Sequence, residues 1–553
     1  MSDRRIVPST YQPPLPLDRF IVRDPPDEEA VPMDVVFVGG GPAGLAGAIE
    51  LAKLVRADNE SGDGIGDIEI AVLDKAAGLG EHILSGAVIN PGPFRTLFPD
   101  IDIKDLPFRA PVTGERVFLL REHSAIRIPT PPTMKNHGNY IASLCEVVRW
   151  MGEQAAALGV NVFTGFPAES LLVDGDNVVG VRTTPSGLDR DGGQGSAYQP
   201  PTDITARVVA LAEGTRGSLS QAFFQWQMIA SQNPQIYALG VKEIWETKRP
   251  LDAIVHTLGW PLPSDAFGGS FMYPLEPNVI ALGLVVGLDY RNANLDVHGL
   301  LQQMKLHPLF RQQLEGAEMV EWGAKTIPEG GYYSIPDRRS GNGCVVLGDS
   351  AGYVEVASLK GVHYAVQSGI LAARTIFEAL KQGDTSASSL SRYDQAVDTS
   401  FIVSDLRARR NMRLAFKSGF YVGGAKSVLM TLTNGVFPGA RIATDEDAAE
   451  PRVAGPVTAL SPDGRLTFSK LDAVFKAGNA TRDDIPSHLV VGTDVPAEAA
   501  EFYEHVCPAG VYERDGDRLT VNAPNCIDCK ATDVVGPRWT PREGGSGPAY
   551  RRM

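Results

Sequence analysis

The cysteines near the end of the chain have the spacing of metal ligands. Cys526 and Cys529 form a CxxC pair in the stretch NCIDCKATD, and Cys507 precedes them in CPAGVYE. Cysteines at this spacing bind zinc or an iron–sulfur cluster, or form a thiol pair. An iron–sulfur run would continue to a cysteine at position 532, where this chain has Thr532. The spacing alone leaves all three chemistries open.

A second set of residues has the spacing of a dinucleotide site. Gly39, Gly41 and Gly44 form GxGxxG in VVFVGGGPAGLAG, between a predicted strand at 34–38 and a predicted helix at 43–54. Such glycines allow a tight turn, close approach to a pyrophosphate and close helix–strand packing. A second predicted strand, 68–75, carries Asp74 near its end, where an acid binds ribose hydroxyls. We predict dinucleotide binding; the alternative is a glycine-rich turn that binds nothing.

A later motif favours FAD over NAD. In VVLGDSAG, Gly348 and Asp349 end another predicted strand, ahead of a predicted helix at 361–380. In two-motif FAD proteins an Asp at this place binds the ribityl chain. The alternative is an Asp that only caps a helix. More than 300 residues separate the two motifs, which leaves room for an inserted substrate domain.

The remaining elements frame these motifs. A helix over 145–160 and a following strand continue the first unit, 186–201 is a polar loop, and about 235–335 alternates strand patterns typical of an antiparallel sheet. We predict an α/β + β fold: a Rossmann-like, two-motif FAD domain, an inserted β-rich domain and a separate C-terminal domain that carries the three cysteines. The expected bounds are an irregular lead-in at 1–32, the FAD domain at 33–235 and 325–449, the β-rich domain at 236–324 and the C-terminal domain at 450–553.

Composition excludes some functions. The 553 residues carry a net charge of −15, which argues against nucleic-acid binding. Five scattered cysteines do not form a disulfide framework. The first residues lack the apolar core of a signal peptide, and no apolar run is long enough to span a membrane. These features favour a soluble cytoplasmic protein, with or without a membrane-touching surface.

Read together, these segments resemble the electron-transfer flavoprotein–ubiquinone oxidoreductase family. The resemblance covers nearly the whole chain, with the segments in the family's order: LDKAAGLGEHILSGAVINP, NHGNYI, LGVKEIWE, GGSFMYPL, EGGYYSIP, KGVHYAVQSG, CPAGVYE and GGSGPAY. It implies FAD, one [4Fe-4S] cluster and quinone as substrate, and it makes 236–324 the quinone-binding, membrane-facing domain and 450–553 a ferredoxin-like iron–sulfur domain. The activity implied is electron transfer from reduced electron-transfer flavoprotein, through the cluster and FAD, to ubiquinone or menaquinone. The resemblance also implies a peripheral location on the cytoplasmic side of the bacterial inner membrane.

The resemblance also implies site residues. It adds Lys75, Ser85, Gly86 and Gly361 to the FAD site and places quinone against Gly268 and Gly269, whose alternative role is a β-bulge. It makes Cys507, Cys526 and Cys529 cluster ligands and leaves the fourth open among Thr532, Asp533, Asp528 and solvent. Three outcomes remain: a [4Fe-4S] cluster with an oxygen ligand, a [3Fe-4S] cluster, or no cluster. Cys145 and Cys344 are not obvious substitutes.

Two departures from the family lie near the flavin. Val362 replaces a Thr in KGTH, and Pro328 replaces an Asn before EGG, so two hydrogen-bond donors to the flavin are lost. The apolar stretch 419–439 is the best candidate for membrane contact. His256 and His363 are expected to be structural rather than acid–base residues.

Two other functions stay open at this stage. One is an FAD-dependent reductase or hydroxylase of a long, prenyl-like substrate, and the other is a non-catalytic flavin redox sensor.

Overall fold

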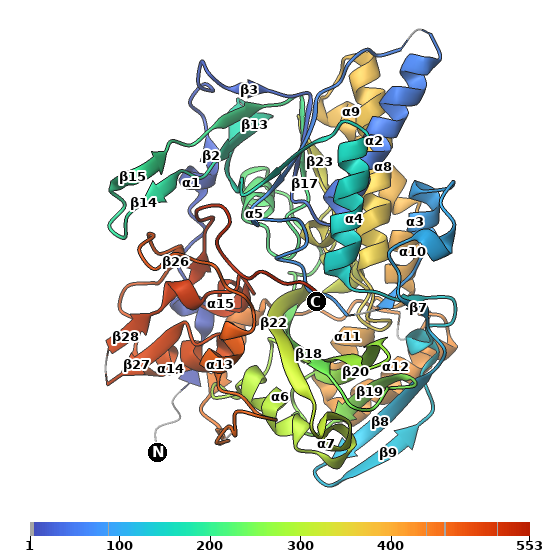
Figure 1. Ribbon diagram of the computed structural model, residues 1–553, viewed down its shortest axis with the longest axis vertical. Coiled ribbons are helices and arrows are strands. Elements are labelled where there is room, and N and C mark those ends of the chain that lie inside the picture. The colour runs from blue at the N-terminus through green and yellow to red at the C-terminus, as the bar shows by residue number, and fades with distance from the viewer. Residues whose placement is uncertain (1–4, 63, 87, 438, 458–459, 517) are drawn as a thin grey trace.

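The architecture is that of a computed structural model, which describes residues 5–62, 64–86, 88–437, 439–457, 460–516 and 518–553. Figure 1 shows a layered α/β part at the top, strands of a second large sheet below it, and the C-terminal part, in red, beside both. Two apolar cores hold these parts together. One lies in the α/β layers, and the other joins the second sheet to the C-terminal part.

The upper part is built on a six-stranded sheet in the order β11-β5-β4-β17-β24-β23, of which the first five strands are parallel. Its strands are β4 (Val35–Val38), β5 (Ile70–Asp74), β11 (Asn161–Thr164), β17 (Val208–Leu211), β23 (Ser340–Gly341) and β24 (Cys344–Val346). Helices α2 (Pro42–Glu60), α4 (Leu144–Ala157) and α8 (Val362–Gln382) accompany it, and α2 packs on the other two. The predicted β-α-β unit and the predicted helix at 361–380 are confirmed. Parallel strands end at one edge of a sheet, so the two motifs meet there.

The lead-in is more regular than expected. Within residues 5–32, β2 (Ile21–Val22) pairs with β12 (Ala168–Asp174), and β3 (Val31–Pro32) pairs with β16 (Asp203–Thr205). With β13 (Asn177–Thr183) they form a five-stranded sheet. The short helix α1 (Leu17–Phe20) precedes β2, and β1 (Arg5–Ile6) pairs with β25 (Arg452–Val453). Two-residue strands are too short to show a periodic pattern, which is why the sequence did not reveal them.

The polar loop at 186–201 also differs from its prediction. It contains a hairpin of β14 (Ser186–Leu188) and β15 (Gln194–Gln199). Most of its residues are exposed, so its strands lack the apolar alternation by which a half-buried strand is recognised.

The second large sheet has seven strands in the order β22-β18-β21-β20-β19-β8-β9. They are β8 (Glu115–Arg121), β9 (Ser124–Ile128), β18 (Tyr237–Glu246), β19 (Ile254–Gly259), β20 (Gly268–Glu276), β21 (Val279–Gly287) and β22 (Glu318–Pro328). The antiparallel prediction is confirmed from β18 to β22, whereas β8 joins β19 in parallel. The sheet thus takes strands from 115–128 and continues to 328, outside the expected 236–324. Pairing between strands so distant in sequence leaves no local pattern.

Further helices cover these sheets. They are α3 (Gly92–Leu97), α5 (Ser218–Trp226), α6 (Val297–Lys305), α7 (Pro308–Leu314), α9 (Ala387–Asp398), α10 (Phe401–Ala408), α11 (Met412–Ala415) and α12 (Phe420–Leu432). A small sheet joins β6 (Val88–Ile89), β10 (Tyr140–Ile141) and β7 (Ala110–Pro111).

Helix α12 is unusual because much of its apolar surface faces outward. Tyr421 is 82% exposed, Leu432 78% and the following Val436 74%. Among the described residues, no helix combines the length and apolar character needed to cross a bilayer.

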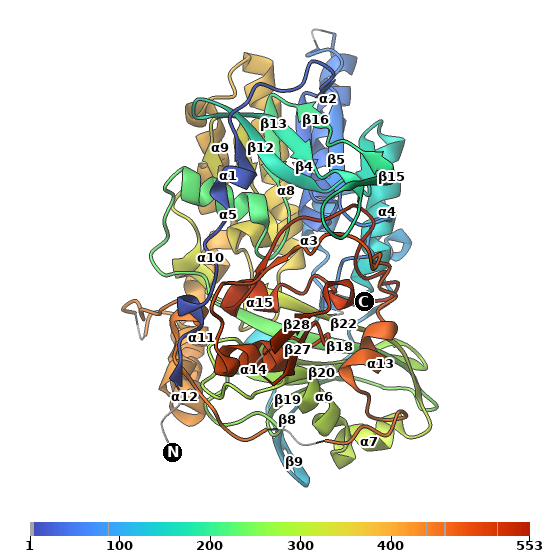
Figure 2. The same ribbon diagram turned by 90° about the vertical axis from the view of Figure 1, so that its left-hand side faces the viewer.

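The C-terminal part consists of short elements laid against the second sheet (Figure 2). They are α13 (Lys470–Phe475), β26 (Leu489–Val490), α14 (Ala497–Val506), β27 (Tyr512–Asp515), β28 (Arg518–Val521), α15 (Ala531–Val535) and β29 (Arg538–Trp539). The chain end is buried as well: a Cβ atom on Gly323 of β22 would lie 2.6 Å from the ring of Tyr550. This packing brings the cysteine-bearing loop beside the end of β22.

Candidate redox site

The glycine motif forms a tight turn between β4 and α2. Gly39 has φ +113°, and a Cβ there would lie 2.3 Å from the carbonyl oxygen of Ala212. A Cβ on Gly44 would lie 2.1 Å from the carbonyl oxygen of Gly39, so helix and strand approach closely. At Gly41 the nearest atom to such a Cβ is 3.9 Å away, and this residue lines a large cavity. The first N–H groups of α2 therefore begin at the cavity wall, which suits a phosphate.

Asp74 lies at the end of β5, on the same cavity wall. Its Oδ2 accepts a hydrogen bond from the N–H of Gly40 and its Oδ1 one from the N–H of Ala76, both at 2.8 Å. Burial raises the pKa of this carboxyl, although the two backbone donors oppose the shift. The carboxylate thus fixes the glycine turn, and its expected contact with a ribose stays a prediction. Along the sequence, helix α2 and the loop after it lie between the glycines and Asp74, whereas in the fold Asp74 contacts the glycine turn.

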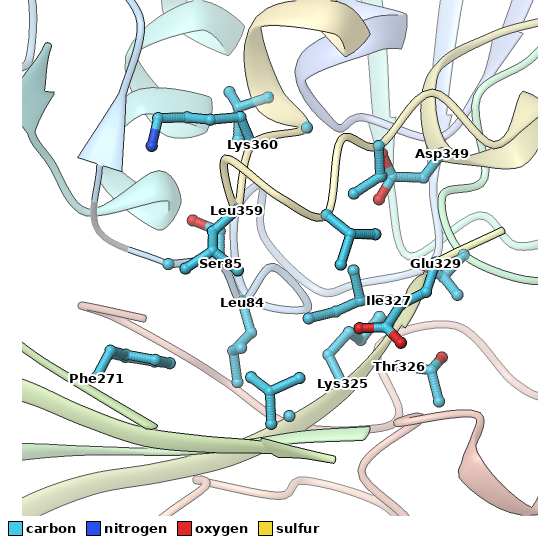
Figure 3. Close-up of a pocket in the computed structure, with 18 of the residues that line it drawn as sticks. Leu84, Ser85, Phe271, Lys325, Thr326, Ile327, Glu329, Asp349, Leu359 and Lys360 are labelled. Carbon is cyan, nitrogen blue, oxygen red and sulfur yellow. The ribbon is translucent and has the colours of Figure 1, made fainter. Parts of the chain in front are cut away.

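The cavity has a volume of about 920 Å³ and extends from the glycine turn, past β20, to α12. This size is typical of a site that encloses a large ligand. Figure 3 shows side chains from distant parts of the chain around it: Leu84 and Ser85 after β5, Phe271 on β20, Lys325 on β22 and Asp349 after β24. Lys75, Gly86 and Gly361 also line it.

Asp349 meets the cavity where the second motif predicted. It lies in a short 3-10 helix that starts at Gly348, directly after β24. Burial raises the pKa of its carboxyl to about 6, against the opposing charge of Lys325. A Cβ on Gly361, the residue before α8, would lie 3.7 Å from Asp349 Oδ1. The sheet edge, the 3-10 helix and the start of α8 therefore meet at one point.

Two lysines that sequence reasoning did not find also line the cavity. Lys242 donates to the carbonyl oxygen of Ser85 at 2.9 Å, and Lys325 to that of Asp528 at 3.1 Å. Burial lowers the pKa of each to about 8. A negative group in the cavity would be stabilised by these cations. Their signal in the sequence was weak, because each is one of several charged residues in a largely buried strand.

Gly268 and Gly269 form part of the cavity wall at the start of β20. A Cβ on Gly268 would lie 2.1 Å from the carbonyl oxygen of Val285, and one on Gly269 2.7 Å from that of Thr257. Strand packing alone therefore requires both glycines. Because both also face the cavity, the structural and the quinone-binding explanations are compatible.

The remaining residues singled out near the flavin have different environments. Val362 starts α8 and lines the cavity, whereas Pro328 ends β22 opposite Tyr237. His256 lines the cavity, and burial lowers its pKa to about 3, as it does for His363. Neutral, buried imidazoles agree with a structural role for both. The family segment LDKAAGLGEHILSGAVINP and the membrane-contact candidate 419–439 each contain one residue outside the described ranges, Ala87 and Pro438 respectively.

The three C-terminal cysteines and Thr532 surround one small void of about 20 Å³. Cys507 follows α14, Cys526 and Cys529 lie in the loop before α15, and Thr532 is in α15. All four residues are at most 9% exposed. Cys145 and Cys344 do not line the void, and Cys145 donates to the carbonyl oxygens of Ile83 and Met553. The fold therefore gathers the predicted ligand set at one place.

The chemistry of these thiols suits a cationic group. Burial raises the pKa of Cys526 to about 12, and it raises the pKa of Cys529 further, together with repulsion from the other two thiols. Buried thiolates need positive charge close by, which a metal centre supplies. The residues present thus fit an iron–sulfur cluster.

The two neighbouring aspartates are held by cations, although Asp528 Oδ1 also accepts a hydrogen bond from Cys526 Sγ at 3.8 Å. Asp528 pairs with Lys75 at 2.6 Å and Arg542 at 2.9 Å, and Asp533 pairs with Arg216 at 2.8 Å. Neither lines the void, whereas Thr532 does. Burial raises the pKa of the Asp528 carboxyl, but the charges of Arg542 and Lys75 lower it more. This pKa therefore lies well below its usual range. Asp533, a candidate fourth ligand, is therefore already committed to an ion pair.

A glycine turn at one sheet edge, with a second Gly-Asp motif beside it, defines a Rossmann-type, FAD-binding flavoprotein. Solved structures of this class share the fold. A geranylgeranyl bacteriochlorophyll reductase-like protein from Thermoplasma acidophilum is 17% identical, with a TM-score of 0.54 over 74% of this chain and 97% of that one. The flavin-dependent brominase Bmp2 is 16% identical, with a TM-score of 0.51 over 73% and 94%.

Sequence comparison gives the family. Residues 237–327 match the family described as "ETF-QO, ubiquinone-binding", and 464–551 match "Electron transfer flavoprotein-ubiquinone oxidoreductase, 4Fe-4S". The mitochondrial electron transfer flavoprotein-ubiquinone oxidoreductase of Oryza sativa subsp. japonica is 38% identical over 95% of this chain and 94% of its own length. The Homo sapiens protein of that name is 37% identical over 94% and 89%. The chain belongs to the electron-transfer flavoprotein–ubiquinone oxidoreductase family.

Proposed function

We propose that this protein oxidises reduced electron-transfer flavoprotein and reduces a membrane quinone, with two electrons and two protons converting each quinone to quinol. One observation carries the proposal: Lys530 and Trp539 line both the large cavity and the three-cysteine void. The two sites thus share a wall. FAD and an iron–sulfur cluster, when bound, supply the electron-carrying chemistry.

In this proposal the chain binds and orients FAD at the glycine turn. The N-terminus of α2 would receive the pyrophosphate, and Asp74 would contact a ribose. Asp349 and the start of α8 line the same cavity and would hold the ribityl chain and ring. Lys242 and Lys325 stabilise negative charge in the same cavity.

The quinone end of the cavity lies toward α12. Gly268 and Gly269 form one wall, and Val428 and Leu432 of α12 also line the cavity while being 59% and 78% exposed. An exposed apolar helix at a cavity mouth suits contact with the bilayer surface and direct entry of an apolar substrate. We propose peripheral membrane contact through α12. The location on the cytoplasmic side of a bacterial inner membrane stays a prediction.

The two alternative functions explain fewer features of the structure. Neither a prenyl-type reductase nor a flavin sensor explains why three cysteines meet beside the flavin cavity. Relatedness to the reductase-like structure concerns the fold alone.

The proposal is tested with the purified holoprotein and reduced electron-transfer flavoprotein. We expect reduction of a soluble quinone analogue, and strong loss of it in Cys526→Ser with FAD retained. Cys344→Ser is the matched control, because Cys344 is also buried but lies in β24, away from the void. If Cys526→Ser still reduces the quinone analogue, the three-cysteine site has no role in this electron transfer.

A further inference from the structure

The fourth side of the cysteine void is unlike the other three. Cys507, Cys526 and Cys529 present sulfur atoms, whereas Thr532 presents a hydroxyl that lies 3.5 Å from the hydroxyl of Tyr512. Both hydroxyls belong to buried residues. The position that would complete a set of four thiolates therefore holds a pair of neutral oxygens.

The nearby carboxylates are not free to replace a thiolate. Asp528 accepts hydrogen bonds from Trp539 Nε1, from Arg542 and, at 3.8 Å, from Cys526 Sγ, and it also pairs with Lys75. Asp533 Oδ2 pairs with Arg216, while its Oδ1 accepts from the backbone N–H of Trp539. Breaking one such buried pair costs about 3–5 kcal/mol. Swinging either carboxylate to the void would leave a buried cation unpaired.

One histidine is the remaining competitor. A ring nitrogen of His488, Cys526 Sγ and a carboxylate oxygen of Asp528 lie within 4.8 Å of one another. Neither ring nitrogen of His488 has a hydrogen-bond partner in the described part of the chain. However, His488 does not line the void, and its ring packs edge-on against Trp539. It is therefore the ligand that an experiment must distinguish from Thr532.

We propose that this chain holds its cluster by three thiolates only, and that the fourth iron, which faces Thr532 and Tyr512, is exchangeable. The inference deepens the proposed function and uses only its cluster assignment. Neutral hydroxyls bind iron more weakly than thiolates do, so oxidation should release the iron that lacks a thiolate. One-electron oxidation of [4Fe-4S]²⁺ by ferricyanide then yields [3Fe-4S]⁺ and one Fe²⁺, and the electron goes to ferricyanide.

The experiment uses anaerobically purified full-length protein. After stoichiometric ferricyanide, we expect about one Fe²⁺ per cluster by a ferrous chelator and the narrow electron paramagnetic resonance signal of a three-iron cluster. Ferrous iron with dithionite should restore the four-iron signal. Thr532→Cys supplies the missing thiolate and should retain its iron under the same treatment. Thr532→Ser is the matched control, and it should release iron as the natural protein does.

Each outcome decides between ligand sets. A natural protein that keeps all its iron overturns the proposal, and if His488→Ala then releases it, the histidine is the fourth ligand. Release from the natural protein supports the proposal even if Thr532→Cys fails to fold. Iron exchange in a protein that cannot reduce quinone would support this inference and overturn the proposed function. If the protein reduces quinone and its four-iron cluster keeps all its iron, this inference is overturned and the proposed function is supported.

Discussion

The ammonium of Lys530 lies over the indole of Trp539, with its nitrogen 3.2 Å from the ring centroid. Lys75 approaches the same ring at 4.4 Å, and Trp539 Nε1 donates to Asp528 at 2.9 Å. Trp539 is thereby fixed in the wall between the flavin cavity and the cysteine void. An aromatic ring held there by three charged residues is placed to connect the two sites.

Trp539→Phe should slow electron exchange between the two centres and lower stability. The loss of a buried hydrogen bond to a carboxylate costs about 1.5–3 kcal/mol. Stopped-flow absorbance would give the exchange rate and urea unfolding the stability. Trp245→Phe is the matched control, since Trp245 Nε1 donates to Glu243 at 2.7 Å and its ring faces Lys305, away from both sites. Equal rates in the two variants would rule out the connecting role.

Gly269→Ala should weaken quinone binding while FAD remains bound. The new Cβ would lie 2.7 Å from a strand carbonyl, so the strand must shift at a cost of about 1–3 kcal/mol and narrow the cavity. We expect a higher KM for a quinone analogue and unchanged FAD content. Gly424→Ala is the control: Gly424 also lines the cavity, but no atom of the described residues lies within 4 Å of its added Cβ. An unchanged KM in Gly269→Ala would leave these glycines with a structural role alone.

A feature could be predicted from the sequence only where the residues that signal it lie close together along the chain. The glycine turn, Asp74 and Asp349 were predictable because each combines a local motif with a strand or helix that must flank it. The cysteines were predictable from spacing, but the side chains around them were not. Lys242, Lys325 and Trp539 reach the site through pairing between strands far apart in sequence. The recruitment of β8 and β9 into the second sheet was missed for the same reason.

The choice among fourth ligands shows the limit most clearly. In sequence, Thr532, Asp533 and Asp528 are equivalent oxygen donors a few residues apart. In the structure, the two aspartates are held by Arg216, Lys75 and Arg542, and only Thr532 faces the void. These partners come from distant segments, so no local pattern could separate the candidates.

Leu432→Asp should reduce binding to lipid vesicles. Leu432 is 78% exposed on α12, and transferring a leucine side chain into an apolar phase is worth about 1.5–3 kcal/mol, or roughly tenfold to a hundredfold in affinity. Cosedimentation with phosphatidylcholine vesicles measures this change. Phe475→Asp is the control, because Phe475 is 84% exposed on α13, in the C-terminal part. If both variants lose binding equally, α12 is not the contact surface.

Asp447→Asn should change how stability depends on pH. Asp447 Oδ2 accepts from the N–H of Tyr237 at 2.7 Å, and its Oδ1 has no hydrogen-bond partner among the described residues. Burial, together with the charge of Asp289, raises the pKa of this carboxyl to about 8. The folded state therefore binds more protons than the unfolded state between about pH 4 and pH 8, and the natural protein loses stability as pH rises through that window.

An amide at position 447 does not titrate, so Asp447→Asn should gain stability relative to the natural protein as pH rises. The gain is at most about 1.4 kcal/mol per pH unit within the window and levels off above about pH 8. Urea unfolding midpoints across this range measure it. Asp289→Asn should instead lose stability at neutral pH. Arg413 holds the pKa of the Asp289 carboxyl low despite burial, so replacing this carboxylate by an amide removes a stabilising ion pair. Parallel curves for the natural protein and Asp447→Asn would show that Asp447 stays ionised in the folded state, balanced by Arg452 and Arg413.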